Sequence, residues 1–139
     1  MVGINPLSNS ELTLDNLDTH GAVYRPYTWD CIKAGEMTLG RAAADISTDI
    51  ARKYGSDAPV VVSICGDSVL HLPASAGTRT VGYSADEVYA FVSVLSKQCR
   101  VSCLTVAELK TSLDPAAAPA VGEFLTQCLR VYHRNSNSK

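Results

Sequence analysis

The stretch VVVSICGDSVL, residues 60–70, decides the fold. With Pro59 it forms the run PVVVSIC, which is apolar on both alternating sets of positions. This pattern is typical of a parallel strand that helices cover on both faces. The run ends in a thiol, a glycine and a carboxylate, at Cys65, Gly66 and Asp67. Because functional groups of open α/β sheets collect at the carboxyl ends of strands, this end is our first candidate site.

Strand and helix patterns alternate on either side of this stretch. The expected strands are residues 2–7, 22–27, 59–65 and 100–109, and the expected helices lie at residues 10–20, 28–35, 36–54, from 84 onward and from 114 onward. Ser84 and Glu87 form a capping box, and Asp114 with Pro115 is a helix start. Such alternation predicts an α/β fold: a three-layer αβα domain with a parallel sheet of about four strands. We expect this domain to span residues 1–133, followed by a disordered tail at residues 134–139.

The composition describes one globular domain and excludes some partners. The chain has 139 residues, of which 46% are hydrophobic and 19% charged, and a net charge of -2 with a pI near 5.8. Its basic residues are scattered, so we expect no nucleic-acid partner. No apolar run approaches the roughly 20 residues that cross a bilayer, so we expect no membrane partner and a cytoplasmic location.

The five cysteines follow no disulfide or zinc pattern. They lie at positions 31, 65, 99, 103 and 128, with no C-x-x-C pair. Most free cysteines are buried as small apolar residues, and we expect this for Cys103 and Cys128, which lie inside apolar patterns. Cys65 as a nucleophile is a separate hypothesis, and it needs a nearby base that the local sequence does not supply.

The strand-end pattern around Cys65 resembles that of the arginase, agmatinase and formiminoglutamase family, the ureohydrolases. That family carries a strand of the form V-x-x-S-[IF]-D-x-D, whose two aspartates bridge paired Mn²⁺ ions. VVVSICGDSV fits it at every place but one. Asp67 matches the second aspartate, and Cys65 stands where the first is expected.

Two further segments extend the resemblance over nearly the whole chain. Residues 106–114 read VAELKTSLD, which is similar to the family's V-x-E-[VL]-N-P-x-L-D and closest to formiminoglutamase. Glu108 then matches the glutamate that holds the amidine group of the substrate, and Lys110-Thr111 departs from Asn-Pro. Residues 74–77, ASAG, resemble the family's small-residue loop. The resemblance implies the carboxyl-terminal half of an arginase-like fold, with Mn²⁺ as the family's cofactor.

The departures from the family pattern predict a site that is incomplete in this chain. The family's other ligands come from a Gly-rich loop with a histidine and a D-x-H-x-D strand, and neither motif is present in this sequence. Cys65 offers a soft sulfur that suits Mn²⁺ poorly. We therefore expect no bound Mn²⁺ and a structural or regulatory role. The alternative is part of a Mn²⁺-dependent hydrolase of small linear amidines that an amino-terminal half completes.

Each candidate residue also has an ordinary structural interpretation. Asp67 is either a remnant metal ligand or a cap at a strand end, and Glu108 is either a substrate contact or a solvated carboxylate. His71 is best explained as a loop histidine. A few strands cut from a larger sheet leave unprotected edges, so the expected partner is another copy of the chain or an amino-terminal half-chain.

Overall fold

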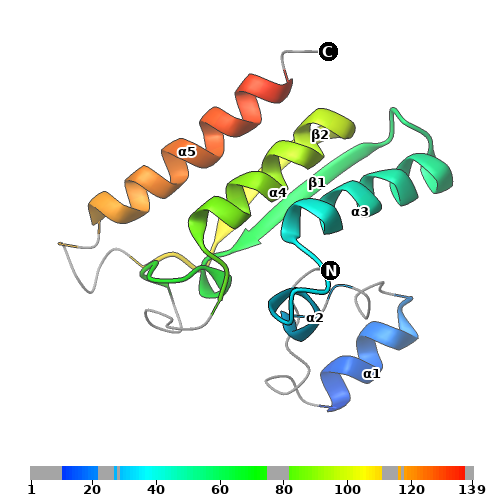
Figure 1. The fold of residues 1–139 in the computed structure, drawn as a ribbon, viewed down its shortest axis with the longest axis horizontal. Coiled ribbons are helices and arrows are strands. Elements are labelled where there is room, and N and C mark those ends of the chain that lie inside the picture. The colour runs from blue at the N-terminus through cyan, green and yellow to red at the C-terminus, as the bar shows by residue number, and fades with distance from the viewer. Residues whose placement is uncertain are drawn as a thin grey trace.

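The computed structural model describes residues 11–21, 27, 29–74, 82–110, 116 and 118–136. From residue 39 onward helices and strands alternate, with a parallel sheet behind a layer of long helices (Figure 1). The elements are α1 (Glu11–Thr19), α2 (Trp29–Lys33), α3 (Leu39–Tyr54), β1 (Pro59–Cys65), the 3₁₀ turn η3 (Gly66–Ser68), α4 (Ala85–Gln98), β2 (Arg100–Ala107) and α5 (Ala118–Ser136).

The sheet of the described part has two strands, β1 and β2, which run parallel. This confirms the predicted α/β class and both strands that were expected after residue 55. The other expected strands, residues 2–7 and 22–27, fall almost wholly outside the described residues, as does the expected helix start at Asp114. The last helix continues to Ser136, past the expected domain end at residue 133, and Asn135 is buried in it.

The helices begin and end where local sequence signals place them. Thr38 caps α3 by accepting a hydrogen bond from the Arg41 amide. Ser84 and Glu87 form the predicted capping box at the start of α4, each accepting from the other's main chain. Gly55 ends α3 with a φ of 91°, a conformation that a residue with a side chain rarely adopts. The capping box explains why α4 begins where the sequence predicts, and Gly55 why α3 ends there, whereas the Thr38 cap starts α3 at Leu39, three residues later than expected.

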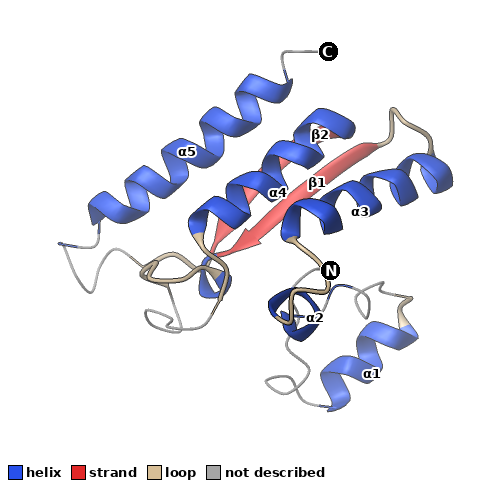
Figure 2. Cartoon of the chain, viewed as in Figure 1, coloured by secondary structure: helices blue, strands red, loops and turns tan. Residues whose placement is uncertain are grey.

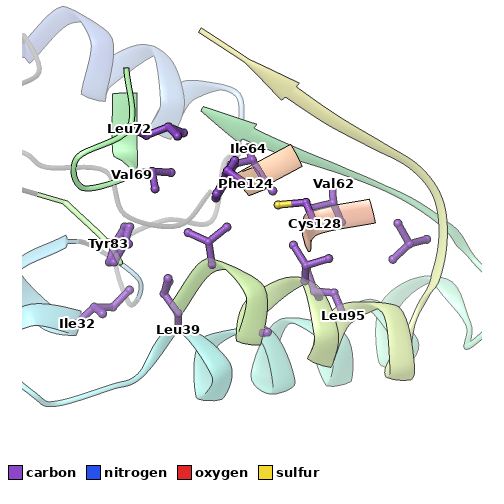
Figure 3. Close-up of a cluster of buried hydrophobic side chains, with 14 of the residues drawn as sticks. Ile32, Leu39, Val62, Ile64, Val69, Leu72, Tyr83, Leu95, Phe124 and Cys128 are labelled. Atoms are coloured by element: carbon purple, nitrogen blue, oxygen red, sulfur yellow. The ribbon is translucent and has the colours of Figure 1, made fainter. Parts of the chain in front are cut away.

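The core lies between the sheet and one layer of helices. In Figure 2, α4 lies in front of the strands, with α3 and α5 on either side of it. Both α4 and α5 contact β2, and α3 packs against α4. Figure 3 shows Val62 and Ile64 of β1 among side chains of the helix layer, including Leu95 and Phe124. This apolar burial is the main stabilising contribution to the fold.

The opposite face of the sheet is exposed. Val61 is 64% exposed, whereas its neighbour Val62 is 5% exposed. The apolar character of Val61 is typical of a covered strand. Among the described elements, α4 and α5 contact β2, and they lie on the side of Val62, whose side chain is buried with theirs.

Candidate functional site at the strand ends

The end of β1 turns sharply into η3. Ser68 Oγ donates a hydrogen bond of 2.6 Å to the carbonyl oxygen of Cys65, and the Val69 amide donates one of 3.0 Å to the carbonyl of Gly66. Asp67 therefore lies in a 3₁₀ turn rather than in a strand. The strand rule that places residues i and i+2 on one face does not extend from Cys65 to Asp67.

Gly66 brings the ends of the two strands together. A β-carbon at this position would lie 2.8 Å from Leu109 Cδ2 and 3.0 Å from the carbonyl oxygen of Glu108. The main-chain carbonyl oxygens of Glu108 and Ala107, at 3.0 and 3.1 Å, are closer than in most real β-carbon contacts, so any larger residue would require a small shift of the neighbouring strand end. Cys65 pairs with Ala107 in the sheet, directly before Glu108. The structure thus places the predicted residues Cys65, Asp67 and Glu108 at neighbouring strand ends.

Glu108 adopts a left-handed backbone conformation with a φ of 61°. For a residue with a side chain this conformation costs on the order of 1 kcal/mol, so the surrounding contacts must hold it. Leu109 forms an antiparallel bridge with Ala74, and the Lys110 amide donates to the carbonyl of Pro73 at 3.2 Å. The segment after η3 therefore fixes the turn at Glu108, and the carboxylate is exposed at the sheet's edge.

The side chains at these strand ends do not provide the metal ligands that a two-metal centre needs. Asp67 and Glu108 supply carboxylates, and both take part in interactions within the chain. Within the described ranges, no three His, Cys, Asp or Glu side chains are placed to hold a metal ion. A Mn²⁺ pair needs several oxygen and imidazole ligands, and the Cys65 thiol is a soft donor. The described residues therefore do not by themselves provide the ligand set of a two-metal centre.

The thiols divide into exposed and buried groups. Cys65 and Cys103 are exposed, and Cys99 and Cys128 are buried. Burial raises the pKa of the Cys128 thiol to about 11. The prediction that Cys128 is buried is confirmed, and the same prediction for Cys103 is wrong. An irregularity in the register between Val60 and Val61 inserts one extra residue in β2, which moves Cys103 to the exposed face.

A cavity of about 550 Å³ is lined by residues that do not include Cys65, Asp67 or Glu108. The loop of residues 69–72 and the first turns of α4 and α5 line it, so its walls come from segments far apart in the sequence. Tyr89 borders the cavity, and its pKa is raised by burial and by the nearby Cys128, Glu123 and Asp86. No sequence pattern predicted this cavity. His71, in its wall, is exposed with a φ of 58°.

Solved structures of the arginase superfamily share this fold. Trypanosoma cruzi formiminoglutamase with Mn²⁺ matches 95% of this chain with a TM-score of 0.68 and 15% identity, and 43% of its own chain is covered. Formimidoylglutamase from Bacillus subtilis matches 94% with a TM-score of 0.75 and 21% identity, over 40% of its chain. Proclavaminate amidino hydrolase from Streptomyces clavuligerus matches 97% with a TM-score of 0.66 and 24% identity, over 42% of its chain.

These similarities establish the fold, which is that of a partial arginase-like domain. The chain spans between 40% and 43% of the length of the three structures. No protein-family model matches the chain, and no curated protein sequence matches it. No helix in the described ranges has both the length and the apolar character needed to cross a membrane.

Proposed function

We propose that this chain is the carboxyl-terminal part of an arginase-like domain with an incomplete metal site, and that its role is structural or regulatory. The observation that carries the proposal is the thiol of Cys65 at the end of β1. The resemblance assigns this position to a metal-bridging aspartate, and the chain is exposed there, beside the turn that holds Asp67. A neutral thiol in place of a carboxylate removes both negative charge and a hard oxygen ligand.

A second function is favoured by the positions of Asp67 and Glu108, which directly follow the ends of two adjacent strands. In this alternative the chain is part of a Mn²⁺-dependent hydrolase that cleaves the C–N bonds of small guanidino or formimino compounds. An amino-terminal half-chain supplies the missing imidazole and carboxylate ligands, and Glu108 contacts the amidine group. The Mn²⁺ in the Trypanosoma cruzi formiminoglutamase structure supports manganese as the metal.

Composition and thiol chemistry also support a cellular location and a set of partners for this chain. Two of the five cysteines, Cys65 and Cys103, are exposed free thiols. Free exposed thiols persist in reducing compartments, which supports a cytoplasmic location. The expected macromolecular partner is an amino-terminal half-chain or further copies of the chain, with no nucleic acid and no membrane. A small amidine is a substrate only if an amino-terminal half-chain supplies the missing metal ligands.

Metal retention and hydrolysis separate the two functions. The chain is coexpressed with the amino-terminal half of an arginase-like protein, and the complex is incubated with excess Mn²⁺, desalted, and analysed for bound manganese by elemental analysis. Release of ammonia, urea or formamide from formiminoglutamate, arginine and agmatine is then measured. We expect no stoichiometric manganese and no hydrolysis even with this half present, because the Cys65 thiol stands in place of a bridging carboxylate. Retention of two ions per chain, or turnover of any of these compounds, would favour the enzyme.

A further inference from the structure

Tyr83 links the turn after β1 to helix α2. Its main-chain amide donates a hydrogen bond of 2.9 Å to the Ser68 carbonyl, and its own carbonyl accepts one of 2.8 Å from the Leu70 amide. Its side chain is 4% exposed and belongs to the same buried cluster as Ile32 of α2 (Figure 3). One residue therefore connects α2 with the η3 turn that contains Asp67.

The main chain of Gly82 packs closely on the same turn. A β-carbon at position 82 would lie 2.6 Å from the Ser68 carbonyl oxygen, a distance that real β-carbons essentially never show. On the other side of the turn, Ser68 Oγ donates a hydrogen bond of 2.6 Å to the Cys65 carbonyl. The turn is thus attached both to the end of β1 and to residues 82 and 83, and Asp67 lies within it.

Lys33 attaches α2 to this arrangement. Its Nζ lies 3.2 Å from both carboxylate oxygens of Glu87 and 5.1 Å from the centroid of the Tyr83 ring. The ion pair with Glu87 is partly exposed, so it contributes little by itself, but the same ammonium group also makes a cation–π contact with Tyr83. One side chain of α2 therefore contacts both the start of α4 and the residue that holds the turn.

The helical conformation of α2 depends on such contacts. The helix has five residues, and isolated helices shorter than about 12 residues are unstable in water. Its apolar residue Ile32 is buried, with 5% exposure. Because so short a helix is not stable alone, the contacts of Ile32 and Lys33 with the rest of the fold stabilise it.

The Tyr83 hydroxyl opposes the docking of α2. It is buried and has no hydrogen-bond partner among the described residues. Burial, together with the charges of Glu87 and of Asp30 in α2, raises the pKa of Tyr83 to about 12, so the side chain is a neutral phenol at physiological pH. A buried hydroxyl without a partner costs free energy, which it recovers when water reaches it. This cost favours an alternative arrangement in which α2 has moved away.

We propose that α2 acts as a latch on the η3 turn: while Lys33 holds α2 in place, the turn that bears Asp67 stays rigid, and release of α2 loosens it. The coupling passes through Tyr83, whose ring contacts α2 and whose main chain bonds to Ser68 and Leu70. Proteins open locally in small cooperative units, so such a release leaves the sheet intact. The latch gives the candidate site a control element outside the site, with or without a bound metal.

Hydrogen exchange of the full chain, followed at single amides by NMR, tests the latch. Lys33→Met removes the charge and keeps a long side chain, and we expect the amides of Leu70 and Tyr83 to exchange at least about fivefold faster than in the unsubstituted chain. The Ala34 amide, which bonds to the first turn of α2, should show the same acceleration. The Cys99 amide at the end of α4 should be unchanged, which reports that the fold is intact.

Three further variants make the test specific. Lys53→Met is the matched control, because Lys53 also lies 5.1 Å from a tyrosine ring, that of exposed Tyr54 at the end of α3, and exchange should be unchanged. Lys33→Arg keeps the positive charge and should retain the slow exchange. Tyr83→Phe removes the hydroxyl without a partner and keeps the ring, so the same amides should exchange more slowly.

Each outcome decides the inference. Faster exchange at Leu70, Tyr83 and Ala34 in Lys33→Met, with slower exchange in Tyr83→Phe, supports the latch. Acceleration confined to Ala34 overturns it, because α2 then moves without affecting the turn, and equal acceleration at Cys99 overturns it, because the opening is then global. Unchanged exchange in Lys33→Met or faster exchange in Tyr83→Phe also overturns it. The measurement needs neither metal nor substrate, so its failure leaves the proposed function standing.

Discussion

Gly66 lies against the main chain of Glu108, so that a β-carbon at position 66 would be 3.0 Å from the Glu108 carbonyl oxygen. This close packing of Gly66 on the Glu108 main chain holds the end of β1 against the end of β2, so the candidate site lies where the two strands end. Glycine at the end of β1 and the left-handed conformation of Glu108 at the end of β2 are two parts of one local geometry.

Gly66→Ala should destabilise the protein by about 1–3 kcal/mol, because the added methyl group meets two main-chain carbonyls that cannot move independently. Thermal unfolding monitored by circular dichroism measures the change. Gly122→Ala is the matched control: it lies in α5 with no atom within 4 Å of the added carbon, so it should stabilise by up to about 1 kcal/mol. Equal effects of the two substitutions would contradict the close approach at Gly66.

Val62→Ala should cost about 1–3 kcal/mol of stability, whereas Val61→Ala should cost almost nothing. The two residues are adjacent and chemically identical, but their exposed fractions are 5% and 64%. Chemical denaturation of the full chain compares them. A large loss from Val61→Ala would show that the sheet face bearing Val61 is covered in solution.

Glu87 should contribute stability that is lost in acid. Burial acts to raise its pKa, but hydrogen bonds from Ser84 and Lys33, together with the Lys33 charge, outweigh burial and lower the pKa below its ordinary 4.5. The folded state therefore favours the charged carboxylate, so the contribution is present above pH 4.5 and disappears as the pH falls through the lowered pKa. Glu87→Gln should flatten this part of the stability curve, measured as unfolding midpoints from pH 7 to pH 3. Glu123→Gln, on the exposed part of α5, should leave the curve unchanged.

Cys65→Asp tests whether this position corresponds to the metal-bridging aspartate. In the chain alone we expect at most weak Mn²⁺ binding and no hydrolysis, because the imidazole ligands are absent. In complex with the amino-terminal half of an arginase-like protein, the variant should bind Mn²⁺ at least about tenfold more tightly than the unsubstituted chain in the same complex, measured by calorimetry. Cys103→Asp places a carboxylate at another exposed position of the same face and is the control. If Cys65→Asp binds no better than Cys103→Asp, the assigned position is wrong.

Much of the local structure followed from the sequence. Apolar periodicity located α3, α4 and both described strands, and the capping box at Ser84 located the start of α4. The same patterns predicted the α/β class, and the strand-end residues led to the arginase-like fold that the solved structures share. These features depend on residues close together in the chain, because hydrogen bonds in caps and side-chain periodicity are set within a few residues.

Only the tertiary structure decided which groups meet and which face is exposed. An extra residue in β2 places Cys103 on the exposed side, and no periodicity reveals a register change that depends on the neighbouring strand. The 3₁₀ turn removes Asp67 from the strand alternation, and the cavity beside Tyr89 is formed by three distant segments. The apolar residues of β1 indicated that both of its faces are suited to burial. Which face is covered depends on the packing of α3, α4 and α5, because burial is a property of the assembled elements and not of one strand.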